Sequence, residues 1–309
     1  MAEGYDHVSS YGPRFLGIMR QTLFPRRCPY CRDIIVPGGS LICPDCEPQL
    51  PFIRGRSCEK CGKQLRESRG DKQPVLCQNC QKHERSFSFS LALLNYDGVS
   101  AEIMAGFKYL HKKEYADTLA WLICKHLGAD LRTLGAQAVV PVPVHAKRKR
   151  ERGYNQAEAL GRSLCTFLNV GYPALFLMGL SEDMLRDVRL LKEYQEKRVR
   201  SSGIGVWGRN GDRPPENVRF QLMPDLLIRT KNTRAQKNLG AAERLMNLQR
   251  AFSVSPKYAR GASAKLPEAV LLIDDIYTTG ATMEACTRAL FSAGVKKVFG
   301  LCVCAGRDV

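Results

Sequence analysis

The hydrophobic positions of residues 86–305 follow two alternating spacings, and this alternation predicts an α/β domain. Apolar runs typical of strands occupy residues 86–94, 138–144, 270–273 and 298–303. The run at 270–273 has no polar alternation, as in a strand that a parallel sheet buries on both faces. Apolar residues at helical spacing follow two of these runs, including Ile103, Met104 and Phe107 after the first.

Residues 28–85 have few large apolar side chains, so we expect metal to stabilise a small domain there. Two CxxC pairs can complete a closed tetrahedral site of four sulfurs, which is typical of structural zinc and leaves no open position for catalysis. We predict two zinc sites with sequential pairing, although spacing alone leaves a crossed arrangement open. Disulfides and an iron–sulfur cluster are the weaker alternatives. The ligands of the first predicted site are Cys28, Cys31, Cys43 and Cys46, and those of the second are Cys58, Cys61, Cys77 and Cys80.

The other five cysteines lie among apolar neighbours, as small buried side chains do. Many unpaired cysteines, without an apolar signal segment near residue 1, predict a cytoplasmic protein. No apolar run approaches the roughly 18 residues of a membrane span. The formal net charge of +17 falls to about +13 if eight thiolates hold two Zn²⁺ ions. A basic chain of this kind favours a polyanionic partner such as nucleic acid or a phosphate ester.

Residues 270–282 combine two acids with a small polar turn. Asp274 and Asp275 end the apolar run, and residues 278–282 read Thr-Thr-Gly-Ala-Thr before a helical pattern begins. Such a turn, at a helix N-terminus, offers N–H groups and hydroxyls to a phosphate. The acids would repel a bare anion, so they indicate sugar hydroxyls or a divalent cation beside it. A ribose 5-phosphate fits both halves; the alternative is an ordinary turn with a capping threonine.

Five cations crowd the region between the predicted strand at 138–144 and the helix that opens near Asn155. They follow His145 and are Lys147, Arg148, Lys149, Arg150 and Arg152. Cation runs are usually solvated faces or nucleic-acid patches. An α/β sheet, however, binds its ligands where strands give way to helices, and pyrophosphate requires several donors. The position therefore favours a pyrophosphate site.

Two segments resemble a known family. The sequence from Val270 to Thr282 resembles the 5-phosphoribosyl 1-pyrophosphate (PRPP) motif of type I phosphoribosyltransferases, over all of its 13 positions. The Val-Pro-Val-Pro-Val-His sequence that ends at His145, with Arg150, Arg152 and the following Gly-Tyr-Asn-Gln, resembles the ComF (competence protein F) branch. That branch also has an N-terminal double zinc ribbon, so the resemblance covers residues from about 24 to 305.

The resemblance implies a Rossmann-like, mainly parallel sheet flanked by helices, with PRPP as substrate and zinc and Mg²⁺ as cofactors. It assigns the 5-phosphate to Thr278, Thr279, Gly280, Ala281 and Thr282. It assigns the pyrophosphate side to His145, Lys147, Arg148 and Lys149, with Asn155 and Gln156 in support. The residues that it implies in catalysis are Asp274, Asp275, Arg150, Arg152 and Lys231.

A mobile loop is also implied after residue 228, where Arg229, Thr233 and Gln236 match the family pattern. Lys231 replaces the second arginine of that pattern, which keeps the charge but loses the bidentate fork. Lys108, near the end of the first predicted helix, is open between facing substrate phosphate and being a solvated helix end.

Four segments are expected: an arm with a docking helix at 1–27, the double zinc ribbon at 28–85, the phosphoribosyltransferase domain at 86–305, and an inserted charged helix and linker at 181–218 within that domain. The favoured function is phosphoribosyl transfer to an unidentified acceptor, linked to DNA uptake. Two alternatives stay open, a non-catalytic PRPP sensor and a module that binds single-stranded DNA beside DNA-uptake proteins.

Overall fold

A computed structural model describes residues 25–35, 41–66, 76–170, 219–230, 251–258 and 265–307. They fall into two compact units, and the first boundary between these units along the chain lies between Gln49 and Leu50. The helices and strands of the described residues are η1 (Glu47–Gln49), α2 (Gln78–Lys82), β1 (Ser90–Asn95), α3 (Gly98–Tyr109), α4 (Tyr115–Thr133), β2 (Ala138–Pro141), α5 (Ala146–Arg152), α6 (Gln156–Val170), β3 (Gln221–Leu222), β4 (Leu227–Arg229), β5 (Phe252–Val254), η4 (Pro256–Tyr258), β6 (Ala269–Tyr277), α9 (Ala281–Ala293) and β7 (Lys297–Ala305).

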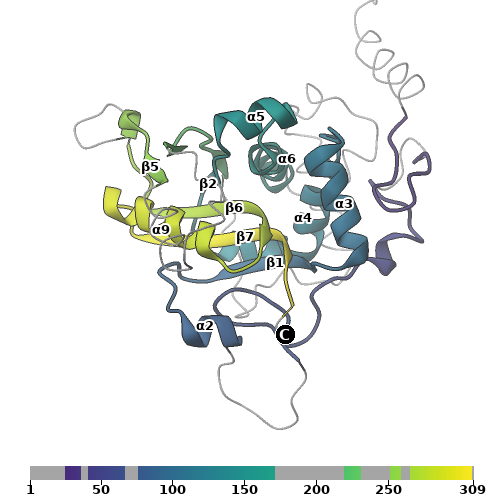
Figure 1. Cartoon of the computed structure of the whole chain (residues 1–309), viewed down its shortest axis with the longest axis horizontal. Helices are drawn as coiled ribbons and strands as arrows, with labels where there is room; N and C mark the ends of the chain where they lie inside the picture. Colours follow the sequence, from purple (N-terminus) through teal and green to yellow (C-terminus); the bar gives the residue numbers. More distant parts are fainter. Residues whose placement is uncertain are drawn as a thin grey trace, which may run out of the picture. The chain divides into compact units, whose positions relative to one another are not determined.

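The larger unit is built on a parallel sheet, as the alternating pattern predicts. Its strand order is β1-β7-β6-β2-β3, and every pair in it is parallel. The β6 strand lies at the centre, with Leu272 opposite Gly300 of β7 and Val140 of β2. The antiparallel hairpin of β4 and β5 forms a separate small sheet. The expected α/β class, with a mainly parallel sheet flanked by helices, is confirmed (Figure 1).

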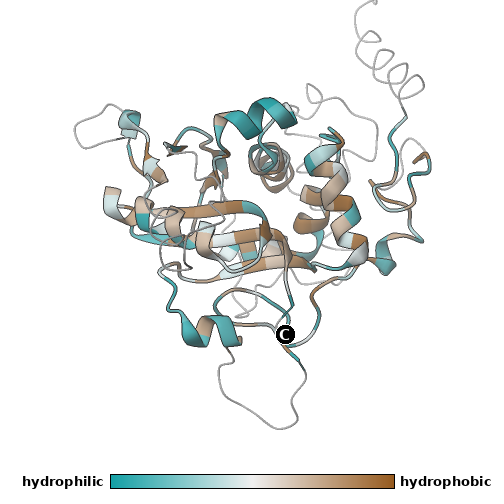
Figure 2. Cartoon of the chain, in the orientation of Figure 1, coloured by the Kyte–Doolittle hydropathy of each residue, from teal (hydrophilic) through white to brown (hydrophobic). Residues whose placement is uncertain are grey.

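Each face of the sheet is covered by different elements, which explains the uninterrupted apolar run of β6. On one face, Gly161 of α6 approaches Val139 and Ile273 so closely that a Cβ there would lie 3.5 and 3.7 Å from their side chains. On the other face, Val270 and Leu272 share a buried cluster with residues of α9, including Cys286 and Leu290. Figure 2 shows hydrophobic sheet strands beside a hydrophilic α5.

The second cysteine set belongs to the core of this larger unit. Cys58, Cys61, Cys77 and Cys80 are all buried, and they lie in the same cluster as Val270 and Leu272. Main-chain hydrogen bonds attach the segment to β1, from Ser90 N–H to the Lys60 carbonyl and from Ile53 N–H to the Leu93 carbonyl. This ribbon therefore forms part of the layer that covers the sheet.

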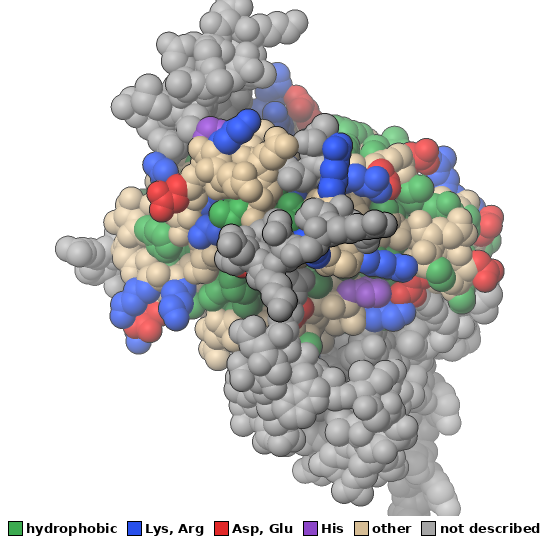
Figure 3. Space-filling view, turned by 90° about the horizontal axis from the view of Figure 1, so that it is seen from below, with side chains coloured by type: hydrophobic (Ala, Val, Ile, Leu, Met, Phe, Trp, Pro, Cys, Tyr) green, Lys and Arg blue, Asp and Glu red, His purple; other side chains and the backbone are tan. Residues whose placement is uncertain are grey.

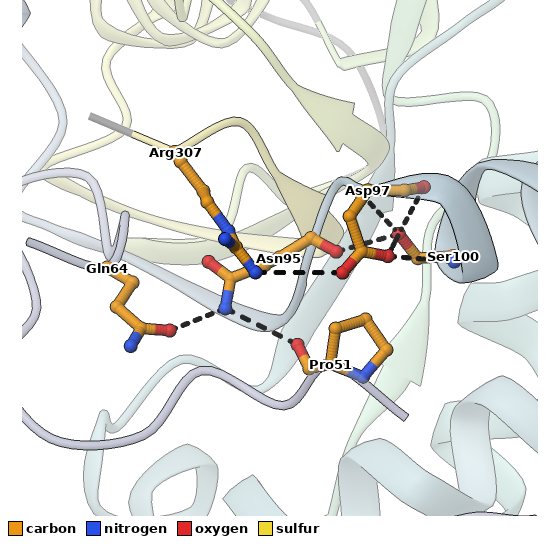
Figure 4. A network of polar contacts seen from close by, with 6 residues as sticks. All are labelled: Pro51, Gln64, Asn95, Asp97, Ser100 and Arg307. Carbon is orange, nitrogen blue, oxygen red and sulfur yellow. Dashed lines mark hydrogen bonds and ion pairs between the residues drawn. The ribbon is translucent and has the colours of Figure 1, made fainter. Parts of the chain in front are cut away.

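A polar network fixes the same ribbon where β1 passes into α3. Asn95 donates to Gln64 of the ribbon and, at 3.5 Å, to the Pro51 carbonyl (Figure 4). Asp97 caps α3 in a reciprocal capping box with Ser100, whose hydroxyl also donates to the Asn95 carbonyl at 2.7 Å. The junction of β1 and α3 thus combines a helix cap at Asp97 with the contact from Asn95 to the ribbon.

Candidate functional site

The two acids project from the carboxyl end of β6, as the buried strand before them predicts. The strand continues beyond them to Tyr277, so they belong to the strand rather than to the turn that follows. The Asp275 N–H donates to Asp274 Oδ1 at 2.8 Å. Burial and the neighbouring Asp275 raise the pKa of Asp274 to about 7. The arrangement therefore disfavours two bare negative charges side by side and favours binding of a cation or of hydroxyl donors.

Lys108 faces the acids, which answers the question that the sequence left open. At the end of α3, its Nζ lies 3.0 Å from Asp275 Oδ2, and both side chains are mostly buried. Lys108 is thus not a solvated helix end, because its ammonium group pairs with the Asp275 carboxylate.

Arg229 lies in a strand, although the sequence placed it in a mobile loop. It lies on β4, with its guanidinium 5.2 Å from the centre of the Phe252 ring on β5. Burial and the nearby Arg148 lower its pKa, while Asp274 acts in the opposite direction. Arg229 of β4 therefore lies within electrostatic range of Asp274 on β6 and of Arg148 on α5.

The predicted phosphate turn lies between β6 and α9. Thr278 and Thr279 are exposed, and Ala281 opens the 13-residue helix. Gly280 adopts φ 77° as the N-cap of α9, and a Cβ there would lie 2.1 Å from the Tyr277 hydroxyl. Only glycine satisfies both the left-handed conformation and this close approach. The turn thus presents the first N–H groups of a helix at the same strand end as the acids, where an anion binds well.

The cation run forms a helix of its own, a difference from the connection expected between a strand and a helix. His145 caps α5 by accepting a hydrogen bond from Lys147 N–H at 3.2 Å, and no residue of α5 is buried. Its lysines make long surface ion pairs, Lys147 with Glu151 at 3.9 Å and Lys149 with Glu158 at 3.7 Å. Arg148 and Arg150 are exposed on the same helix.

Asn155 and Gln156, which follow the run, contact the ends of β2 and α5. Asn155 donates to the Val142 carbonyl at 3.1 Å, which joins the end of β2 to the start of α6. Arg152 donates to Gln156 Oε1 at 3.1 Å and stacks 5.3 Å from the centre of the Tyr109 ring. Contacts of Arg152 with Gln156 and Tyr109 therefore hold the C-terminal end of the helix that contains the cation run.

The two cysteine sets form two separate groups, as sequential pairing predicts. Within each group the four sulfurs lie within 4.8 Å of one another. Cys31 and Cys43 sulfurs are 3.6 Å apart in the first group, and Cys61 and Cys77 sulfurs are 3.6 Å apart in the second. Tetrahedral zinc with bonds of about 2.3 Å needs sulfurs about 3.8 Å apart. All thirteen cysteines are described as free thiols, so the disulfide alternative is wrong.

Sequence reasoning missed one contact to the phosphate turn. Arg85, which follows the second ribbon, donates to the Thr279 carbonyl at 2.7 Å. It is one of two Lys or Arg residues between the last cysteine pair and the first predicted strand, and no spacing marked it.

Several predicted residues lie outside the described part of the chain. These are Lys231, Thr233 and Gln236 of the expected loop, most of the arm at 1–27, and the insertion at 181–218. Among the helices that the structure describes, none is long and apolar enough to cross a membrane.

Comparison with known proteins agrees with this organisation. The family model described as a double zinc ribbon domain matches residues 19–81. Competence protein F of Haemophilus influenzae is 24% identical over 279 residues, which cover 89% of this chain and 95% of that protein. Competence protein ComFC of Bacillus subtilis is 22% identical over 268 residues, which cover 82% of this chain and 79% of that protein.

Proposed function

The chain is a relative of the competence protein F family with a double zinc ribbon near its N-terminal end, and from this premise we propose that it is a phosphoribosyltransferase acting on PRPP. The observation that carries the proposal is the convergence at one end of β6. Two acids and the start of a helix lie there, with Lys108 paired to Asp275 and Arg229 within electrostatic range of Asp274. A sugar with hydroxyls between two phosphate groups is complementary to this arrangement.

Each part of PRPP has a matching group of residues. The turn at 278–282 would bind the 5-phosphate through its N–H groups and hydroxyls. Asp274 and Asp275 would accept hydrogen bonds from the ribose hydroxyls or hold the shell of a divalent ion. Oxygen ligands of this kind suit Mg²⁺, which would neutralise pyrophosphate charge when bound. Cations of α5, led by Arg150 and Arg152, would face the pyrophosphate.

In the proposed reaction the bond between C1 of ribose and the pyrophosphate oxygen breaks, and its electron pair leaves with pyrophosphate. A bond from C1 to the nucleophilic atom of the acceptor forms through an oxocarbenium-like state. Catalysis then rests on stabilising the leaving charge and excluding water, rather than on a strong base. We assign the first task to Arg150, Arg152 and Lys231, and the second to the segment with Thr233 and Gln236.

The test is isothermal titration of zinc-loaded protein with PRPP, with and without Mg²⁺. We expect Mg²⁺-dependent binding in the wild type and its loss in Asp274→Asn/Asp275→Asn. The matched control, Asp225→Asn/Glu268→Gln, removes the same two charges from surface ion pairs with Lys257 and Lys296 and should bind as the wild type does. Absence of binding in folded wild-type protein would exclude the transferase.

Two other outcomes separate the alternatives. Binding of PRPP without pyrophosphate release across a panel of acceptors would favour a PRPP sensor. The second candidate, binding of single-stranded DNA, is favoured by the exposed α5 and by Tyr109, which is 64% exposed beside Arg152. An aromatic side chain next to cations is the usual platform for an unpaired base. This role would also fit relatives named for competence.

A further inference from the structure

Arg85 connects the second cysteine group to the phosphate turn. Its side chain is 8% exposed, and one guanidinium nitrogen, Nη2, makes two contacts. It donates to the Asn79 side-chain oxygen on α2, the helix that contains the metal-group residue Cys80, and to the Thr279 carbonyl at 2.7 Å. A hydrogen bond from a charged donor in a mostly buried position is among the stronger kinds.

The contact with the Thr279 carbonyl fixes the direction of a peptide group. In a planar trans peptide, the carbonyl and the N–H point in opposite directions. With the Thr279 carbonyl directed at Arg85, the N–H of Gly280 points away from it. Glycine has several accessible backbone conformations, so the turn by itself does not fix this orientation. The guanidinium of Arg85 supplies the missing constraint.

A second contact holds the same two segments together. Ser86 donates from its N–H and its hydroxyl to the two oxygens of Glu284, at 2.8 and 2.6 Å. Glu284 is 2% exposed and lies in the first turn of α9, where its N–H bonds to the Gly280 carbonyl. Residues 85–86 therefore contact the turn at Thr279 and the helix at Glu284, on either side of Gly280.

We propose that Arg85 is a positioning residue for the 5-phosphate site and that it couples this site to the metal group of Cys58, Cys61, Cys77 and Cys80. The inference rests on the proposed function. Arg85 keeps the Gly280 N–H directed at the anion, and α2 keeps Arg85 in place through Asn79. Metal in the second group thereby acts on phosphate binding, although it touches no substrate.

The experiment compares two ligands that test opposite sides of the site, ribose 5-phosphate for the turn and inorganic pyrophosphate for the cations of α5. Arg85→Met should weaken ribose 5-phosphate binding about tenfold or more, the effect of losing a charged hydrogen bond. Pyrophosphate affinity should change by less than about twofold, because that side of the site does not depend on Arg85. Arg85→Lys, which keeps the charge and one donor, should recover part of the loss.

Arg132→Met is the matched control. Arg132 also donates from Nη2 to a main-chain carbonyl, that of Leu168 at 2.8 Å, but between α4 and α6. It should lower stability without changing the ratio of the two affinities. Asn79→Ala leaves Arg85 charged but removes its partner on α2. It should weaken ribose 5-phosphate binding more than pyrophosphate binding, as Arg85→Met does. If Arg85→Met does not fold, Asn79→Ala takes its place.

The outcomes distinguish the positioning role of Arg85 from the proposed phosphoribosyltransferase function on which it rests. Wild-type protein that binds neither ligand overturns both. Wild-type protein that binds both ligands, with Arg85→Met losing them equally or losing neither, overturns the positioning role alone. Selective loss of ribose 5-phosphate in Arg85→Met and in protein stripped of its second metal, with Arg132→Met unchanged, supports the coupling.

Discussion

At the scale of single residues, the acids of β6 are held in a costly arrangement. Asp274 is largely enclosed, and its neighbour Asp275 is already paired with Lys108 at 3.0 Å. Burial and Asp275 together raise its pKa from the ordinary 3.8 to about 7. Groups with pKa values shifted in this way concentrate where a protein binds or transforms a ligand.

This shift predicts that Asp274 lowers stability as pH rises. Between about pH 4 and pH 7 the folded protein retains a proton that the unfolded chain releases, so the free energy of unfolding falls through that window. Asp274→Asn removes the titration. We expect it to melt higher than the wild type at pH 8, by about 2–4 °C for each 1 kcal/mol gained, and to lose about half of this advantage at pH 5.5.

Calorimetry of zinc-loaded protein at the two pH values measures the effect. Asp225→Asn is the control, because it removes a carboxylate from a surface ion pair with Lys257 and should not stabilise the protein at either pH. A melting difference between Asp274→Asn and the wild type that stays constant from pH 5.5 to 8 would contradict the assignment.

At the scale of elements, the two metal groups differ in their surroundings. Three of the four cysteines in the second group are less than 3% exposed, and all four lie in the sheet core. In the first group Cys31 is exposed and Cys43 is partly exposed. A chelator reaches an exposed ligand directly, but it reaches a buried one only when the surrounding structure opens.

Zinc release should therefore occur in two phases of equal amplitude. We expect the fast phase to come from the first group and the slow phase to require opening of the larger unit. Release into an excess of a chromogenic chelator follows both. Cys31→Ser should abolish the fast phase and leave the slow phase. Cys61→Ser changes the second group instead, and we expect it to lower the stability of the sheet. A single phase in the wild type would contradict this difference.

At the scale of the whole molecule, the cationic side chains that give the net charge of +17 are interspersed with acidic side chains. On the face drawn in Figure 3, Lys and Arg side chains occur in separate groups with Asp and Glu among them. The concentration of charge on α5 is a local feature, with Lys147 61% and Lys149 57% exposed. Any binding of single-stranded DNA that depends on specific cations should therefore involve this helix.

If α5 contacts the DNA backbone, Lys147→Ala/Lys149→Ala should reduce the salt dependence of binding. Each lost phosphate contact lowers the slope of log K against log salt by about 0.7 for a single strand, so two give about 1.4. Fluorescence anisotropy with a labelled oligonucleotide between low and moderate salt measures the slope. Lys257→Ala/Lys296→Ala removes the same charge elsewhere and should leave the slope nearly unchanged; equal effects of the two pairs would indicate diffuse attraction.

Local sequence determined much of the fold, because the forces concerned act over a few residues. The apolar run at 270–273 determined a strand buried on both faces, and the glycine at 280 determined a left-handed turn before α9. The CxxC spacing determined two groups of four sulfurs, since two residues between cysteines suffice to turn both sulfurs onto one ion. The run of cations at 147–152 was visible, but its own helix was not, because a single short helix has little periodic signal.

Only the tertiary structure decided which distant residues meet. Lys108 and Asp275 are separated by 167 positions, and Arg85 and Thr279 by 194, so no local pattern could pair them. The cysteine spacing identified both ribbons, but only the packing shows that the second ribbon shares the buried core of the sheet. The physical reason is that the sheet brings the ends of separate strands together and leaves a face to be covered. Which segment covers it depends on the packing of the complete unit.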